Sequence, residues 1–133
     1  MKVLIFGNPL VKEDSLPLKI LPKLRKKFPS IEFKEFDTAE SLEKEGEELI
    51  IIDTVKNIED VKIFEDIEIF ERKKIFSTHD YDLAYELKAL KKLGYIKKVR
   101  IIGIPSKISE EECLRKVSEK LKSILFSRND SHN

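Results

Sequence analysis

Residues 2–14 read KVLIFGNPLVKED, and this stretch decides the fold. Residues 3–6 form an apolar, partly β-branched run, which predicts a buried strand. The following Gly7-Asn8-Pro9 predicts a turn. That turn leads to two carboxylates, Glu13 and Asp14, immediately before an amphipathic helix. The order of strand, acidic loop and helix is typical of the first unit of an open α/β sheet.

Two later stretches repeat the arrangement of an apolar strand followed by a chemically active side chain. Ile50-Ile51-Ile52 is followed by Asp53, and the apolar stretch that begins at Ile75 leads to His79. In an open α/β sheet the carboxyl ends of parallel strands share one edge, where ligands bind. We therefore expect Asp14, Asp53 and His79 to converge on a single site.

The remaining pattern predicts alternating helices and strands around one sheet. Helical spacing is expected over 16–28 with a kink or a delayed helix start at Pro22, over 80–93, and after Ser109, where Glu112 completes a capping box. Strands are expected over 31–36, 49–53, 61–70 and 99–104, with a short helix ending at Gly46. The link from Asp53 to the 61–70 stretch is too short for a parallel crossover, so that stretch is predicted to be antiparallel to its neighbour.

Length and composition predict one soluble domain over residues 1–126 and a disordered polar tail over 127–133. The 133 residues carry a net charge of +1, which gives no nucleic-acid or membrane signature. A single cysteine, Cys113, excludes an intramolecular disulfide framework, and we expect this residue to be a buried structural thiol. With no signal peptide or apolar span recognised, the expected location is the cytoplasm. The Lys, Glu and Ile content is similar to that of proteins from heat-loving organisms.

The three predicted site residues have the chemistry of a metal centre. Two carboxylates and one imidazole suit a divalent cation of borderline hardness, such as zinc, nickel or cobalt. Three protein ligands leave coordination positions open, as a catalytic or substrate-sensing metal requires. The spacing alone has low specificity, because acids end many strands and a lone histidine after a strand is commonly a cap.

Four motifs, in their order and spacing, resemble those of the nickel-iron hydrogenase maturation endopeptidases. They span residues 2 to about 125 and are Gly7-Asn8-Pro9-Leu10 with Glu13-Asp14, Ile52-Asp53-Thr54, Ser77-Thr78-His79-Asp80, and Ile102-Gly103-Ile104-Pro105. The resemblance implies a small single-domain α/β/α sandwich. Together with the strand pattern, the expected sheet is mostly parallel, about five-stranded, with one antiparallel strand.

The resemblance also implies a function. The family removes a short C-terminal tail from the hydrogenase large-subunit precursor after nickel has been inserted, in the manner of an aspartyl-type endopeptidase. Its metal-contacting residues fall on Asp14, Asp53 and His79, and the nickel is supplied by the precursor, with zinc or another divalent cation able to take its place. Two uses of the metal are left open: it docks the loaded precursor, or it also polarises the scissile carbonyl while Asp14 or Asp53 orients water. The expected partner is the precursor, and the expected state is a monomer.

Three departures from the family pattern leave these ligands intact. Ser15 stands where glycine often follows the acidic loop, residues 57–60 lack the usual Gly-Pro pair, and Pro105-Ser106 replaces a common Gln-Pro. These changes concern the surface that would receive the precursor.

Two other classes compete with this interpretation. A phosphoacceptor receiver domain would also use acids after its strands, with Asp14, Asp53, Thr78 and Lys107 in the required order. Receiver acids, however, directly follow the first strand, and the short link after Asp53 has no room for the helix that a receiver needs. The other alternative is a non-catalytic relative that binds only the metal or the precursor.

Overall fold

The structure, a computed structural model, describes residues 1–7, 15–36, 41–75 and 83–130. Five strands form one sheet in the order β2-β1-β3-β5-β4. β4 is antiparallel to β5, and the other paired strands are parallel. This arrangement confirms the predicted mixed sheet. The strand bounds are β1 (Lys2–Ile5), β2 (Glu32–Glu35), β3 (Glu48–Val55), β4 (Lys62–Phe64) and β5 (Lys98–Pro105).

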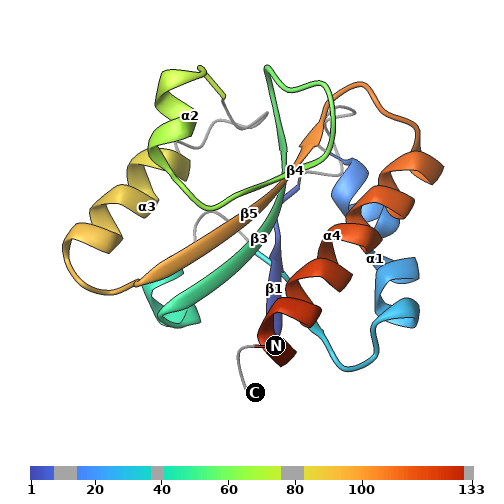
Figure 1. Cartoon of the computed structure of the whole chain (residues 1–133), viewed down its shortest axis with the longest axis horizontal. Coiled ribbons are helices and arrows are strands. Elements are labelled where there is room, and N and C mark those ends of the chain that lie inside the picture. The colour runs from blue at the N-terminus through green and yellow to red at the C-terminus, as the bar shows by residue number, and fades with distance from the viewer. Residues whose placement is uncertain (8–14, 37–40, 76–82, 131–133) are drawn as a thin grey trace.

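Helices cover both faces of the sheet and complete three layers (Figure 1). α1 (Leu16–Lys27) and α4 (Glu110–Asp130) lie on one face, and α2 (Glu68–Arg72) and α3 (Leu83–Lys92) lie on the other. A 3₁₀ helix, η2 (Leu42–Glu45), precedes β3. The buried apolar residues accordingly divide into two clusters, one on each side of the sheet.

Side-chain alternation along β3 decides the direction in which its last residues point. Ile51 and Val55 belong to the core beneath α3, and Ile52 belongs to the core beneath α1 and α4. Because successive side chains of a strand point to opposite faces, Asp53 faces the α2/α3 side and Thr54 faces the α1/α4 side.

Two local predictions were wrong. α1 begins at Leu16 and not at Pro22, so the start of this helix is not delayed; Pro22 is exposed and lacks one amide donor, while the buried Leu21 and Leu24 hold the helix on the sheet. Only the first part of the 61–70 stretch is a strand, and α2 follows it. Asp66 Oδ1 accepts a hydrogen bond of 3.0 Å from the Glu68 amide at the start of α2, and two buried apolar residues, Ile67 and Phe70, are spaced for one helical face.

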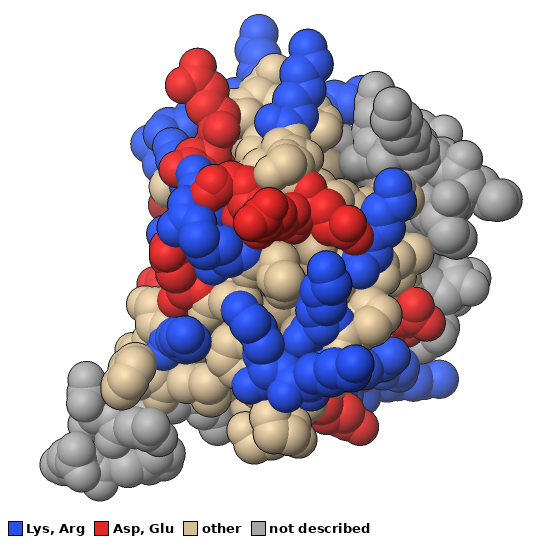
Figure 2. Space-filling model, turned by 90° about the vertical axis from the view of Figure 1, so that its right-hand side faces the viewer, with Lys and Arg blue, Asp and Glu red and all other residues tan. Residues whose placement is uncertain are grey.

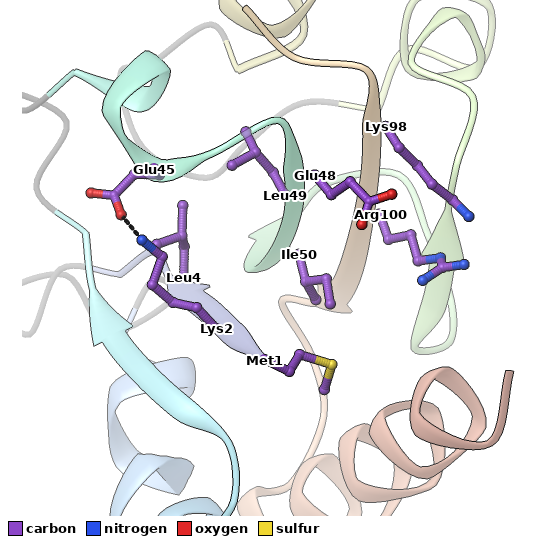
Figure 3. Close-up of a pocket in the computed structure, with 9 residues that line it drawn as sticks. All are labelled: Met1, Lys2, Leu4, Glu45, Glu48, Leu49, Ile50, Lys98 and Arg100. Atoms are coloured by element: carbon purple, nitrogen blue, oxygen red, sulfur yellow. Dashed lines mark hydrogen bonds and ion pairs between the residues drawn. The ribbon is translucent and has the colours of Figure 1, made fainter. Parts of the chain in front are cut away.

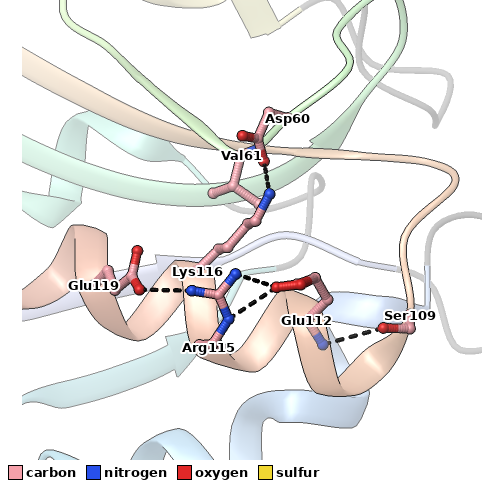
Figure 4. A network of polar contacts seen from close by, with 7 residues as sticks. All are labelled: Asp60, Val61, Ser109, Glu112, Arg115, Lys116 and Glu119. Atoms are coloured by element: carbon pink, nitrogen blue, oxygen red, sulfur yellow. Dashed lines mark hydrogen bonds and ion pairs between the residues drawn. The ribbon is translucent and has the colours of Figure 1, made fainter.

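The start of α4 confirms the predicted cap. Ser109 Oγ accepts a hydrogen bond of 3.1 Å from the Glu112 amide (Figure 4). α4 continues to Asp130.

Glu45 ties the 3₁₀ helix to two neighbouring strands. Its carboxylate binds Lys2 Nζ of β1 and Lys34 Nζ of β2, each at 2.5 Å, and its side chain is only 5% exposed (Figure 3). Burial alone would raise the pKa of Glu45, but the hydrogen bonds and charges of the two lysines outweigh it and lower the pKa.

We expect Glu45→Gln to lower the free energy of unfolding at pH 7 by about 1–2 kcal/mol. The pKa of Glu45 is lowered by folding, so its stabilising contribution is complete above the ordinary value of 4.5 and is lost as the pH falls through the folded value. Urea titrations of both proteins at pH 7 and pH 3 would measure this. A difference of equal size at both pH values would contradict the ionic role.

Candidate active site at the carboxyl edge of the sheet

Asp53 lies in a row of residues that crosses the sheet near its carboxyl edge. It is paired with Gly103 of β5, which is paired in turn with Lys62 of β4. On the other side, the Phe6 amide donates a hydrogen bond of 2.9 Å to the Ile52 carbonyl, which places Phe6 next to Asp53. The row therefore runs Phe6, Asp53, Gly103, Lys62.

The carboxyl group of Asp53 is completely buried. Burying a carboxylate costs several kcal/mol unless cations, metal ions or hydrogen-bond donors match it. A core position on a central strand would normally hold an aliphatic residue, as Ile51 does two residues earlier. The acid at this position is therefore a sign of function at the edge where open α/β sheets bind ligands.

The described residues that precede the two other predicted site segments contact β1, β3 or the loop that follows β3. Segment 8–14, with Asp14, begins just after Phe6 and Gly7. Segment 76–82, with His79, begins after Ile75, and the preceding Lys74 carbonyl accepts a hydrogen bond from Asn57, four residues along the chain from Asp53. Asp14 and His79 themselves lie outside the described residues. Within the part of the chain that the structure describes, no group of three potential metal-ligating side chains comes together.

Gly103 has no room for a side chain on the face that it shares with Asp53. A Cβ atom there would lie 2.9 Å from Phe64 Cε2, 3.1 Å from Val55 Cγ2 and 3.4 Å from Ile58 Cδ1. These distances are shorter than or at the limit of ordinary packing contacts. The glycine therefore lets Phe64 and Ile58 close over β5 next to Asp53.

The model of the HycI family, described as hydrogenase maturation protease, matches residues 36–125 of this chain. The chain belongs to this family. The family expected from the sequence is thus confirmed. The family implies a peptidase, and it implies the hydrogenase large-subunit precursor as the substrate.

Two solved structures have the same fold as this hydrogenase maturation protease family member. A crystal structure of the hydrogenase 3 maturation protease is 19% identical and has a TM-score of 0.52, with coverage of 79% of this chain and 72% of that one. A solution structure of the endopeptidase HycI from Escherichia coli is 18% identical and has a TM-score of 0.53, with coverage of 92% and 90%. A search of curated proteins gave no match.

The connection after β3 separates this family member from the receiver domain considered above. β3 leads into β4 through residues 56–61, which contain no helix, and β4 is antiparallel to β5. The expectation drawn from the short link is therefore confirmed. None of the helices in the described ranges is long and apolar enough to cross a membrane.

The face formed by α1 and α4 carries charged side chains of both signs. Figure 2 shows acidic side chains in a band across the middle of this face, with Lys and Arg above and below it. The opposite, amino edge of the sheet has a small hollow of about 90 Å³ (Figure 3). Glu45 lines that hollow and is neutralised by Lys2, so its role there is structural.

Cys113 is buried in α4, as the sequence predicted, and is not a nucleophile. Its side chain has no solvent exposure, and burial raises the pKa of the thiol to about 12. Thiolate is the reactive form of cysteine, so a thiol with this pKa is inert at neutral pH.

We expect a thiol reagent such as iodoacetamide to leave the folded protein unmodified at pH 8 and to add one label in 6 M urea. Intact mass spectrometry would measure the label. Rapid labelling of the folded protein at pH 8 would show that Cys113 is accessible and would contradict its structural role.

Proposed function

We propose that this family member is an endopeptidase that removes the C-terminal tail of a nickel-iron hydrogenase large-subunit precursor after nickel insertion. Asp14, Asp53 and His79 recognise the nickel that the precursor carries. Substrate binding then reports on metal insertion, because the ligand set is completed only by a loaded precursor.

The observation that carries this proposal is the buried Asp53 at the carboxyl edge of a central strand. Its carboxyl group has no solvent exposure, and the neighbouring strand β1 leads through Phe6 into the segment that holds Asp14. Family membership over residues 36–125 supports the peptidase activity. Two carboxylates and an imidazole are a donor set that fits nickel, zinc or another divalent cation of borderline hardness.

The chain's own residues have separate tasks in this reaction. The buried position of Asp53 excludes bulk water and fixes the direction of one carboxylate, which strengthens its attraction for a cation. Asp14 and His79 would add one oxygen and one nitrogen donor. A metal ion held there supplies positive charge that docks the precursor and polarises a nearby carbonyl.

The test is cleavage of a nickel-loaded precursor, followed by the precursor's intact mass. We expect loss of a defined C-terminal peptide with the wild-type protein, and no loss when nickel is omitted. Asp14→Asn and His79→Ala are expected to be inactive. Glu119→Gln, which removes an equivalent carboxylate from the exposed part of α4, serves as the matched control and should cleave normally.

The outcomes separate the alternatives. Cleavage of the nickel-free precursor at the same rate would show that the metal has no role in recognition. A precursor that binds the protein but keeps its full mass would identify a non-catalytic relative.

A further inference from the structure

The loop of residues 56–60 lies beside Asp53 and is anchored to three other parts of the molecule. It connects β3 to β4 and, because β5 lies between these strands in the sheet, it passes over the carboxyl end of β5. Every residue of such a loop loses conformational freedom when it is ordered, so a short exposed loop keeps one shape only where specific contacts hold it. This loop has such a contact at its start, middle and end.

The first anchor is Asn57. It has a φ of 68°, in the left-handed region that asparagine tolerates better than most residues, and its side-chain amide donates to the Lys74 carbonyl after α2. The second is Ile58, whose side chain lies over Gly103, where only a glycine leaves room for it. These two contacts attach the loop to the α2/α3 side of the sheet and to β5.

The third anchor is Asp60, which attaches the loop to α4 (Figure 4). Asp60 Oδ1 accepts a hydrogen bond of 2.8 Å from the Val61 amide and a second one from Lys116 Nζ. Hydrogen bonds from Lys116 and from the Val61 amide lower the pKa of Asp60, so the pair is charged at neutral pH. An exposed ion pair of this kind adds little to the stability of the whole protein. Its effect is local: it fixes the end of the loop against α4.

The anchored loop leaves two charged side chains pointing away from the core. Lys56 and Glu59 are exposed, and neither side chain has an ion pair or hydrogen bond among the described residues. The loop thus presents a cation, an anion and its backbone groups in a fixed arrangement directly after the strand that carries Asp53. A protein that must receive a peptide segment at Asp53 gains from a fixed wall, because a preordered surface loses less entropy on binding.

We propose that residues 56–60 form a preordered wall of the cleft that receives the precursor's peptide, and that Asn57 and Lys116 are positioning residues that hold this wall. This inference rests on the proposed function. It states that the ordered loop increases the affinity of the protein for the precursor. Neither residue touches the reacting atoms. Long-range contacts hold residues 56–60 in one conformation. This segment lacks the Gly-Pro pair common in the family.

The test compares Lys116→Met with Arg115→Met in cleavage of the nickel-loaded precursor. Arg115 is the adjacent residue of α4, and its ion pairs, with Glu112 and Glu119, stay within that helix (Figure 4). Loss of a preordered surface weakens binding of the ground state and transition state equally, so KM changes while kcat does not. We expect Lys116→Met to raise KM about two- to fivefold, the size that an exposed ion pair allows, with kcat within about twofold.

Further variants separate loop positioning from general stability. Arg115→Met should leave KM unchanged, Lys116→Arg should restore it, and both methionine variants should melt at similar temperatures. Asn57→Gly keeps the positive φ but loses the side-chain amide, and it should raise KM as Lys116→Met does. Combined in one protein, the two changes should multiply KM by less than the product of their separate effects, because both release the same loop.

Equal KM values for Lys116→Met and Arg115→Met would overturn the inference, as would a fall in kcat with KM unchanged. Failure of the proposed function has a different result: the wild-type protein and Arg115→Met would both leave the loaded precursor intact and would both fail to bind it. The inference would then fall together with that function.

Discussion

Asp53→Asn should reduce cleavage of a nickel-loaded precursor by at least about 100-fold while the protein keeps its fold. The amide has nearly the same shape as the carboxylate, so the surrounding core is not repacked. The amide lacks the negative charge. Mutation of groups that merely support a metal ligand lowers activity by about 10- to 100-fold, and loss of the charged ligand itself should lower activity at least as much. Initial cleavage rates and a thermal melt followed by circular dichroism would measure the two parts of this prediction.

Thr54→Val is the matched control for this substitution. Thr54 is the next residue of β3, is equally buried and points to the opposite face of the sheet. Its hydroxyl has no hydrogen-bond partner among the described residues, so valine should leave stability unchanged or slightly raised. We expect normal cleavage from Thr54→Val. A wild-type rate for Asp53→Asn would exclude Asp53 from the site.

The sequence predicts this region well because two simple rules apply to it. An apolar β-branched run predicts a strand, and parallel strands carry their carboxyl ends to one edge. The acid after residues 50–52 therefore had to lie at the ligand-binding edge of the sheet, and the structure confirms this position for Asp53. The convergence of Asp14 and His79 on it stays a prediction, because both lie outside the described residues.

Other features could not be predicted because their causes are distant in the sequence or ambiguous within it. Residues 61–70 contain short apolar runs that suit a strand or a helix, and a side-chain cap from Asp66 decides for a helix in the second half. Two of the three anchors of loop 56–60 bind the Lys74 carbonyl and Lys116 Nζ, which lie 17 and 56 residues from their partners. No local pattern indicates such contacts.

Phe6→Ala should cause a large loss of stability, about 3–5 kcal/mol of the free energy of unfolding. Phe6 is 1% exposed, and its ring stacks on Phe36 with the ring centroids 5.0 Å apart and the planes inclined by 17°. Alanine would lose this contact and leave a cavity at the end of β1, next to Asp53. Domains of this size have about 5–15 kcal/mol of stability in total, so the variant would lie near the limit of folding.

Phe6→Leu tests whether this loss comes from volume at that position. Leucine fills most of the space but cannot stack on Phe36, so we expect it to cost about 1–2 kcal/mol, since it loses the aromatic contact and leaves only a small cavity. Urea titrations of the three proteins give the free energies directly. A loss below about 1 kcal/mol for Phe6→Ala would mean that the core closes around the missing ring. In that case the end of β1 would be deformable, and rigid packing of Phe6 could not be what fixes the direction in which the chain leaves this strand.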